Sequence, residues 1–475
     1  MARRPNILWI CTDQQRYDTI AGLGNEHIRT PNLDRLMAEG TTFTHAFSQS
    51  PVCTPSRAGF LTGMYPTTIR GRQNGQLEPP DGDLLVTRML ADSGYDCGLA
   101  GKLHLAVCQG RMEPRTNDGY RVFHWSHHPA PDWPENAYIQ WLEAQGQTWS
   151  DLYHVPEGAY AYPGIPTEYH QTTWCAEMAV QFIDEARDGP WLMSVNPFDP
   201  HIAFDPPPEY LERYDPGTLP LPDYVPGELD DKPRFQQIDH HGAHGGRGKS
   251  CADATDRQLR EVKAAYYAMI EHIDHHVGRL LDHLDATGQR EDTVVIFHSD
   301  HGELLGDHGM LQKGPHFYDC STRVPLIVSW PGQFEQGLVS DALVELIDLA
   351  PTVLEAAGEE VPERMQARPL TAILRGEADP HEHRESVYCD YYNAMPSHTP
   401  KPYGTMYRDR DWKICVFHGE ARGEGELYDL NADPREHENL WYDPDFAEER
   451  LEYTHRCFDR SVFTMDPWPP RVGRF

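Results

Sequence analysis

The sequence predicts an α/β fold with a central, mostly parallel sheet, followed by a small C-terminal α+β unit with an antiparallel sheet. Two observations carry this prediction. Up to about Gly376, short apolar runs alternate with longer stretches of helical periodicity. Beyond that point the pattern changes to short strands separated by turns, such as residues 412–417. We therefore place a larger domain at residues 1–375 and a smaller domain at residues 376–475.

The predicted strands of the larger unit are apolar runs bounded by turn residues. The first, residues 6–11, reads NILWIC and is apolar after Asn6, as expected of a strand covered on both faces. Similar runs occupy residues 95–100, 190–198, 292–298 and 325–330. Because sites of such folds lie at the carboxyl ends of the strands, the residues that follow each run are the first candidates for chemistry.

The predicted helices lie between these strands. Thr30 is a suitable cap, Pro31 a suitable first helical residue and Gly40 a suitable end, so residues 30–40 form one helix. Helical spacing returns at residues 168–187 and 346–357. The longest helix covers residues 255–287, where apolar side chains recur at positions 259, 262, 266, 270, 273, 277 and 281 on one face.

Two long segments have no periodicity, residues 106–166 and 205–250. Irregular stretches of this length are usually functional lids or arms of an oligomer, so a homo-oligomer is among the expected partners. The first segment carries tryptophans that would suit an aromatic wall or simple packing, and these are Trp125, Trp133, Trp141 and Trp149.

Charge and composition exclude several classes of function. The chain of 475 residues has 41 basic and 74 acidic side chains and a formal charge of −33. Such a surface repels nucleic acid and anionic lipid, so we expect neither as a partner, and a pocket for an anion must be locally basic. The N-terminal apolar run is too short for a signal peptide, and the ten cysteines show no paired spacing. We expect a cytoplasmic protein with reduced thiols.

One stretch, residues 50–63, combines a cysteine with an anion-binding geometry. Pro55 suits a first helical position and Gly63 a C-terminal cap, which predicts a short helix. Cys53 then lies at the helix mouth, where free N–H groups and the dipole favour an anion. Arg57 follows one helical turn later, so its guanidinium can return to the same mouth and bind an oxyanion.

The run Cys-Thr-Pro-Ser-Arg at positions 53–57, followed by Leu-Thr-Gly, resembles the signature of the type I sulfatases of the alkaline phosphatase superfamily. In that family the cysteine is oxidised after translation to formylglycine. Four further segments match the family pattern in the right order, at residues 266–281, 299–303, 348–352 and 426–440. The resemblance implies a three-layer alkaline-phosphatase-like fold and a formylglycine-generating maturase as a partner.

Sulfate ester hydrolysis requires a nucleophile, positive charge against three sulfuryl oxygens and a proton for the leaving alcohol. A hydrated formylglycine at position 53 would offer one hydroxyl for attack on sulfur and a second for release of sulfate, which a serine lacks. The resemblance places one divalent metal, Ca²⁺, Mg²⁺ or Mn²⁺, on five positions: Asp13, Gln14, Cys53, Asp300 and His301. Gln14 and His301 stand where many sulfatases have acidic and asparagine ligands.

The resemblance also assigns the groups around the sulfate. Lys102 bridges sulfate and the hydrate, and His104 takes a proton from the hydrate. His201 corresponds to the histidine that faces the leaving oxygen, and Lys313 to the second sulfate-binding lysine, with His316 as a competitor for that role. His308 is a weaker candidate for substrate contact.

The predicted function is therefore hydrolysis of a small aryl or alkyl sulfate monoester. The main alternative is a related class that hydrolyses phosphonate monoesters and phosphodiesters, which carries the same Asp-Gln and Asp-His pairs. Enzymes of that class tend to have Tyr and Thr in place of the Lys-x-His element, which this chain keeps at Lys102 and His104. A third, non-catalytic reading is a metal- or anion-binding protein on this fold, because a fold does not fix a function.

Overall fold

The computed structural model describes residues 4–129, 133–395 and 398–469. Its centre is an eight-stranded sheet with the order β10-β2-β9-β7-β1-β6-β4-β5, in which β7, β1, β6, β4 and β5 run parallel. Only β9 is antiparallel to its neighbours. The strands of this sheet are β1 (Asn6–Thr12), β2 (Thr41–Phe43), β4 (Asp96–Gly101), β5 (Val122–Trp125), β6 (Trp191–Asn196), β7 (Thr293–Ser299), β9 (Leu326–Ser329) and β10 (Leu338–Ser340).

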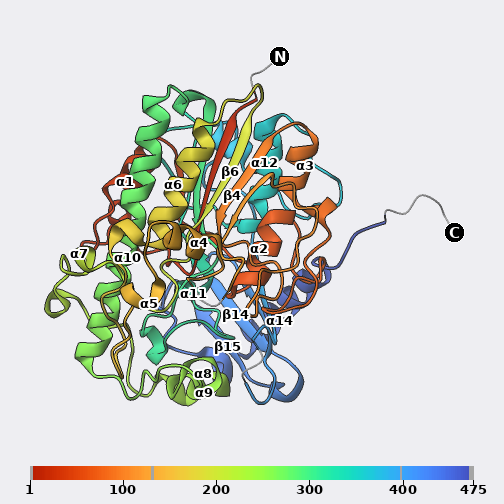
Figure 1. Cartoon of the computed structure of the whole chain (residues 1–475). Coiled ribbons are helices and arrows are strands. Elements are labelled where there is room, and N and C mark those ends of the chain that lie inside the picture. The colour runs from red at the N-terminus through yellow and green to blue at the C-terminus, as the bar shows by residue number, and fades with distance from the viewer. Residues whose placement is uncertain (1–3, 130–132, 396–397, 470–475) are drawn as a thin grey trace, which may run out of the picture.

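Helices cover both faces of this sheet and make three layers (Figure 1). One face carries α1 (Pro31–Ala38), α6 (Gln171–Asp184) and α10 (Asp256–Ala286), and the other carries α2 (Cys53–Thr62), α3 (Val86–Asp92) and α12 (Leu349–Ala357). Alternate residues of β1 point into the hydrophobic cores on the two faces of the sheet. Leu8 and Ile10 pack towards α1, α6 and α10, and Ile7 and Trp9 pack towards α2, α3 and α12. The predicted three-layer fold is confirmed.

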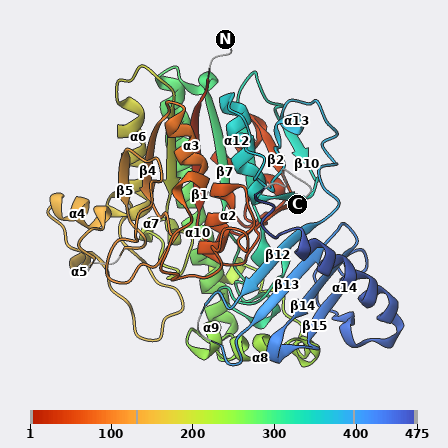
Figure 2. The same cartoon turned by 90° about the vertical axis from the view of Figure 1, so that its right-hand side faces the viewer.

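The C-terminal part forms a four-stranded antiparallel sheet that lies near the carboxyl ends of the central strands (Figure 2). Its strands are β12 (Val387–Tyr392), β13 (Tyr403–Arg408), β14 (Trp412–Phe417) and β15 (Gly425–Asp429), and α14 (Ala447–Val462) packs on β13 and β14. Lys413 of β14 donates to Asp319 over 2.6 Å and so ties this sheet to the larger part. The boundary at residue 376 stays a prediction.

The two irregular segments are more ordered than their sequences indicate. The first contains β5, α4 (Ala137–Ala144) and α5 (Trp149–Leu152), and the second contains α7 (Pro208–Leu211), α8 (Arg234–His240) and α9 (Ala243–Gly246). Elements of four to eight residues span at most about two helical turns, too few for a hydrophobic period to be recognised. The remaining short elements are β3 (Ala46–Phe47), β8 (Arg323–Val324), β11 (Val344–Glu345), α11 (Asp319–Thr322) and α13 (Thr371–Leu374).

The helix after the cysteine motif begins earlier than predicted. The first residue of α2 is Cys53 rather than Pro55, while Gly63 ends the helix in the left-handed region at φ 67° as expected. Proline at the third position costs no hydrogen bond, because the first N–H groups of a helix have no partner within it. Cys53 therefore belongs to the first turn itself.

Candidate active site at the carboxyl end of the sheet

Two neighbouring strands bring three polar side chains to one point. Residues of β1 and β7 pair in parallel up to Thr12 and Ser299, so Asp13 and Asp300, which come next, lie side by side. His301 Nε2 is 3.7 Å from Asp300 Oδ1 and 3.9 Å from Asp13 Oδ1. All three side chains are fully buried. The two strand ends are therefore neighbours in the sheet.

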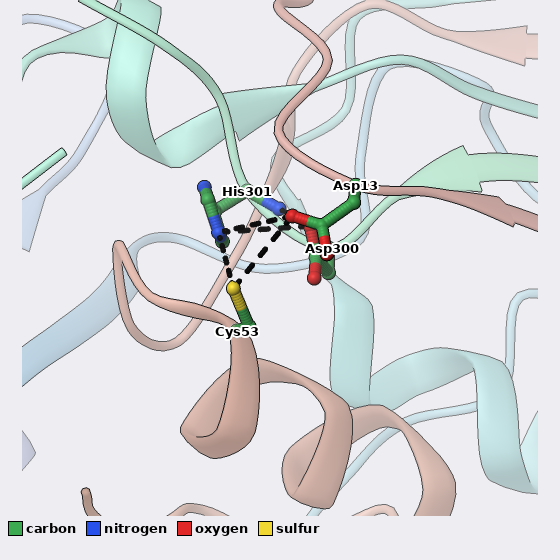
Figure 3. A group of neighbouring side chains, drawn as sticks. All are labelled: Asp13, Cys53, Asp300 and His301. Carbon is green, nitrogen blue, oxygen red and sulfur yellow. Dashed lines mark hydrogen bonds and ion pairs between the residues drawn. The ribbon is translucent and has the colours of Figure 1, made fainter. Parts of the chain in front are cut away.

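Helix α2 points Cys53 into this group (Figure 3). The Cys53 sulfur lies 3.6 Å from Asp13 Oδ1 and 3.2 Å from His301 Nε2. One potential ligand atom from each of Asp13, Cys53, Asp300 and His301 lies within 4.8 Å of all the others. His301 Nδ1 donates to the Gly302 carbonyl over 2.8 Å, which leaves Nε2 directed at the group, as in many metal-bound histidines.

These four side chains fit a divalent cation. Ligand bonds of about 2.0–2.6 Å around one ion require donor atoms within about 5 Å of one another. Two carboxylates and an imidazole suit Ca²⁺, Mg²⁺ or Mn²⁺, and the sulfur of Cys53 occupies the place that a formylglycine oxygen would take.

Gln14 is engaged by other polar groups. Its side-chain oxygen accepts a hydrogen bond from Lys313 and its side-chain nitrogen donates to Glu303. Its backbone N–H donates to Asp300 Oδ1 over 3.0 Å and so orients that carboxylate. A role for Gln14 as a metal ligand stays a prediction.

Two buried cations are bonded to the carboxylates. Arg57 donates from Nε to Asp300 Oδ2 over 2.8 Å and from Nη2 to Asp13 Oδ2 over 3.4 Å. Lys102 Nζ donates to Asp13 Oδ2 over 2.5 Å. Burial alone would raise the pKa of Asp13, but the charges of Lys102, His201 and Arg57 hold this pKa well below its usual value. Two buried cations thus balance the two buried carboxylates of the site.

The same charges act on the cysteine. Burial and the Asp13 carboxylate both disfavour a thiolate at Cys53, yet Lys102, Lys313 and His301 together keep the pKa of Cys53 below its ordinary value. An anionic group at position 53 is therefore favoured by its surroundings.

Lys313 and His316 have different partners. Lys313 bonds Gln14, next to Asp13, and its charge contributes to the lowered pKa of His201. His316 Nε2 is 2.7 Å from Asp239 Oδ2, and both groups are buried. The assignment of the second sulfate contact to Lys313 stays a prediction.

His308 lies in a separate polar cluster. Its ring stacks on Tyr318 with 3.6 Å between centroids, and its Nδ1 is 3.5 Å from Glu228 Oε1. A direct substrate contact by His308 is not supported by these partners.

His104 is fixed by a carboxylate that no sequence motif singles out. Glu113 accepts hydrogen bonds from the backbone N–H groups of His104 and Leu105, over 2.7 and 2.5 Å, and from Trp125 Nε1 over 3.0 Å. Glu113 is buried and lies in the first irregular segment, outside any motif. Burial first, and then the charge of Lys102, hold the pKa of His104 well below its usual value, so this imidazole is neutral.

His201 lies on the side of the site that opens to a pocket. Its Nδ1 donates to the Ile202 carbonyl over 2.7 Å, and its ring packs against Phe198 with 4.5 Å between centroids. The Phe198 ring also lies 5.3 Å from Lys102 Nζ. Phe198 is a second site residue that the sequence analysis missed, because an isolated aromatic residue at a strand end carries no motif.

Within the described residues, no helix combines the length and the apolar character needed to cross a bilayer.

Comparisons with known proteins agree with this geometry. The sulfatase family model matches residues 5–359, and a model of the C-terminal region of N-sulphoglucosamine sulphohydrolase matches residues 306–459. An arylsulfatase of Clostridium perfringens is 30% identical over 97% of this chain and 94% of its own length. A multifunctional alkaline phosphatase superfamily protein, PehA of Trinickia caryophylli, is also 30% identical, over 98% of this chain and 96% of its own length.

Solved structures show the same fold. The phosphonate monoester hydrolase of Agrobacterium radiobacter superposes with a TM-score of 0.81 and 28% identity, covering 98% of this chain and 97% of its own. The family model covers more than half of this chain, and ligand atoms of Asp13, Cys53, Asp300 and His301 lie within 4.8 Å of one another. On these grounds the chain belongs to the sulfatase family and is an enzyme of that family.

Proposed function

We propose that this enzyme hydrolyses a small sulfate monoester, with position 53 oxidised from cysteine to formylglycine by a maturase. The observation that carries the proposal is the position of Cys53 in the first turn of α2, with its sulfur 3.6 Å from Asp13 Oδ1 and 3.2 Å from His301 Nε2. A nucleophile at position 53 lies beside the two buried carboxylates and the two buried cations that are bonded to them.

Asp13, Cys53, Asp300 and His301 would hold the metal, with Gln14 as a further candidate. When bound, the metal supplies Lewis acidity and favours the deprotonated form of the hydroxyl at position 53. Arg57 fixes both carboxylates by its bonds to Asp13 and Asp300 and keeps their oxygens directed at one point.

The remaining polar groups act on the substrate. Lys102 and Lys313 present two ammonium groups to the sulfuryl oxygens, where negative charge must be matched in the transition state. His104 accepts a proton from the hydroxyl at position 53. His201 directs Nε2 at the leaving oxygen, because its Nδ1 is occupied by the Ile202 carbonyl.

Variants of the nucleophile test this proposal. Cys53→Ala should fold and lose sulfatase turnover with 4-nitrophenyl sulfate, because no group remains to attack sulfur. Cys53→Ser should release about one equivalent of alcohol in a burst and then stall, because serine lacks the second hydroxyl that would expel sulfate. Near-normal turnover by Cys53→Ala would disprove the mechanism.

A second candidate function is hydrolysis of phosphonate monoesters or phosphodiesters. The structural similarity to two phosphonate monoester hydrolases favours it, with TM-scores of 0.81 and 0.82, and so do Gln14 and His301 at positions where many sulfatases carry other ligands. Lys102, His104 and Ser56 favour sulfate, since the Lys-x-His element and the intact Cys-x-Pro-Ser-Arg run resemble sulfatases. Both substrates are tetrahedral anions, and cross-reactivity is expected.

A further inference from the structure

A pocket of about 450 Å³ adjoins the proposed catalytic centre. His201 and Phe198 are among its lining residues, and both also lie against the centre. His201 interacts electrostatically with Asp13 and Lys313, and the Phe198 ring lies 5.3 Å from Lys102 Nζ. A substrate whose sulfate lies at Cys53 would therefore extend its alcohol half past His201 into this space. The volume falls within the range of about 300–1,000 Å³ that is typical of small-molecule sites.

The far wall of this pocket is aromatic and comes from the first irregular segment. Tyr138 of α4, Trp149 of α5 and Tyr153 line it, on the β5 side of the sheet (Figure 2). Trp149 and Tyr153 pack with 4.4 Å between ring centroids, and the ring of Tyr138 meets Trp149 edge-on at 6.3 Å. Of the four tryptophans in this segment, only Trp149 lines the pocket. Trp125 and Trp133 stack on each other at 5.9 Å.

Several polar side chains in this wall are already hydrogen-bonded to the protein. Tyr138 donates its hydroxyl to the Tyr169 carbonyl over 2.8 Å, and Tyr153 donates to Asp205 over 2.7 Å. Gln171 accepts from the Phe198 N–H over 3.0 Å and donates to Ser126 over 3.1 Å. A sugar ring needs a hydrogen-bond partner for each of its hydroxyls, and the donors of Tyr138, Tyr153 and Gln171 are already used within the protein. A flat apolar ring makes no such demand.

The pocket also lacks a counterion for an anion. Among the described residues that line it, none is a lysine or an arginine. Its two carboxyl groups, Asp199 and Asp205, have pKa values raised mainly by burial, and neither offers a positive charge to an anion. A carboxylate on the alcohol half would be taken out of water without a partner.

We propose that this pocket binds the alcohol half of the substrate and that it selects an uncharged aromatic alcohol over a sugar or an anionic one. This inference rests on the proposed function, which identifies the substrate as a sulfate ester. The residues that line the pocket indicate the class of alcohol in that ester. The enzyme would then act as an aryl sulfatase whose selectivity comes from Trp149, Tyr153 and Phe198.

A pair of matched substrates tests the charge preference. The methyl ester of 4-(carboxymethyl)phenyl sulfate and the free acid have nearly the same phenol leaving group, and they differ in one remote negative charge. With matured, metal-loaded enzyme, kcat/KM for the ester should exceed that for the acid by about 100-fold. Trp149→Ala should raise KM for the ester about tenfold. Trp330→Ala, which removes a half-buried indole far from the pocket, should leave KM unchanged.

Binding of the free alcohols separates this inference from the proposed function. Calorimetry should detect methyl 4-hydroxyphenylacetate, with loss of binding in Trp149→Ala, and should detect neither 4-hydroxyphenylacetate nor glucose. If the enzyme hydrolyses both sulfates equally well, or binds glucose more tightly than the phenol, the pocket assignment is wrong and the sulfatase proposal stands. If no ester is hydrolysed but the phenol binds through Trp149, the proposed function is wrong and the pocket assignment stands.

Discussion

Removal of the Lys102 amine distinguishes the sulfatase proposal from its alternative. Lys102 Nζ lies 2.5 Å from Asp13 Oδ2, and in Lys102→Ala that oxygen keeps only the longer bond of 3.4 Å to Arg57. Loss of one contact to transition-state charge usually costs about 100- to 1,000-fold in rate. A sulfate monoester presents three terminal oxygens to the site, whereas a phosphonate monoester presents two and a carbon substituent. Removal of the Lys102 amine should therefore slow hydrolysis of the sulfate ester more than that of the phosphonate ester.

We expect Lys102→Ala to lower kcat/KM for 4-nitrophenyl sulfate by about 100-fold or more, and that for 4-nitrophenyl phenylphosphonate by about tenfold. Lys232→Met is the matched control, because it removes another buried amine, bonded to Tyr428 and the Glu436 carbonyl, and should leave both rates unchanged. Steady-state rates at saturating metal measure both effects. Equal losses on the two esters, or a wild-type enzyme that prefers the phosphonate, would refute the sulfatase assignment in favour of the alternative.

Further predictions concern the metal, the His104 loop and a buried carboxyl group. Chelation with EDTA should abolish turnover. It should also lower the free energy of unfolding by about 2.7 kcal/mol, relative to protein in the presence of metal at 100 times its Kd. Added Ca²⁺, Mg²⁺ or Mn²⁺ should restore turnover and stability, and activity that survives complete chelation contradicts the metal site. Glu113→Gln should lower kcat about tenfold with little change in KM, because the His104 N–H bonds Oε1 and the Leu105 N–H bonds Oε2, and an amide nitrogen in place of either oxygen removes one of these two acceptors; an unchanged kcat excludes the positioning role. Burial raises the pKa of Asp390 to about 7, above its unfolded value, so the unfolded chain loses this proton first and stability falls as pH rises from about 4 to 7. Asp390→Asn should remove this fall in the free energy of unfolding, which is about 1.4 kcal/mol per pH unit and is measured by urea titration. If the free energy of unfolding falls equally with pH in the wild type and the variant, the prediction is contradicted.

The residues that do the proposed chemistry were accessible from sequence because they sit at places fixed by secondary structure. Asp13, Asp300 and His301 follow apolar runs that had to be parallel strands, and Cys53 and Arg57 share one helical turn. Backbone geometry then brings them together without any knowledge of side-chain packing. The start of α2 was misplaced by two residues, because proline is tolerated anywhere in the first turn.

The groups that support and surround the site were not accessible in this way. Glu113 reaches His104 from nine residues away within a segment that has no period, and Phe198 is one aromatic side chain among many. Trp149 could not be separated from Trp125, Trp133 and Trp141, because only the fold of α4 and α5 decides which indole faces the pocket. Such contacts depend on tertiary packing, which leaves no periodic signal in the sequence.

Mass spectrometry of the peptide that carries position 53 tests the central claim most directly. The protein should be produced with and without a formylglycine-generating maturase, and 4-nitrophenyl sulfate turnover should be measured on the same samples. We predict that the thiol of Cys53 is replaced by an aldehyde only when the maturase is present, and that turnover rises in proportion to the fraction converted. Full turnover by protein in which Cys53 remains an unmodified thiol would contradict the account.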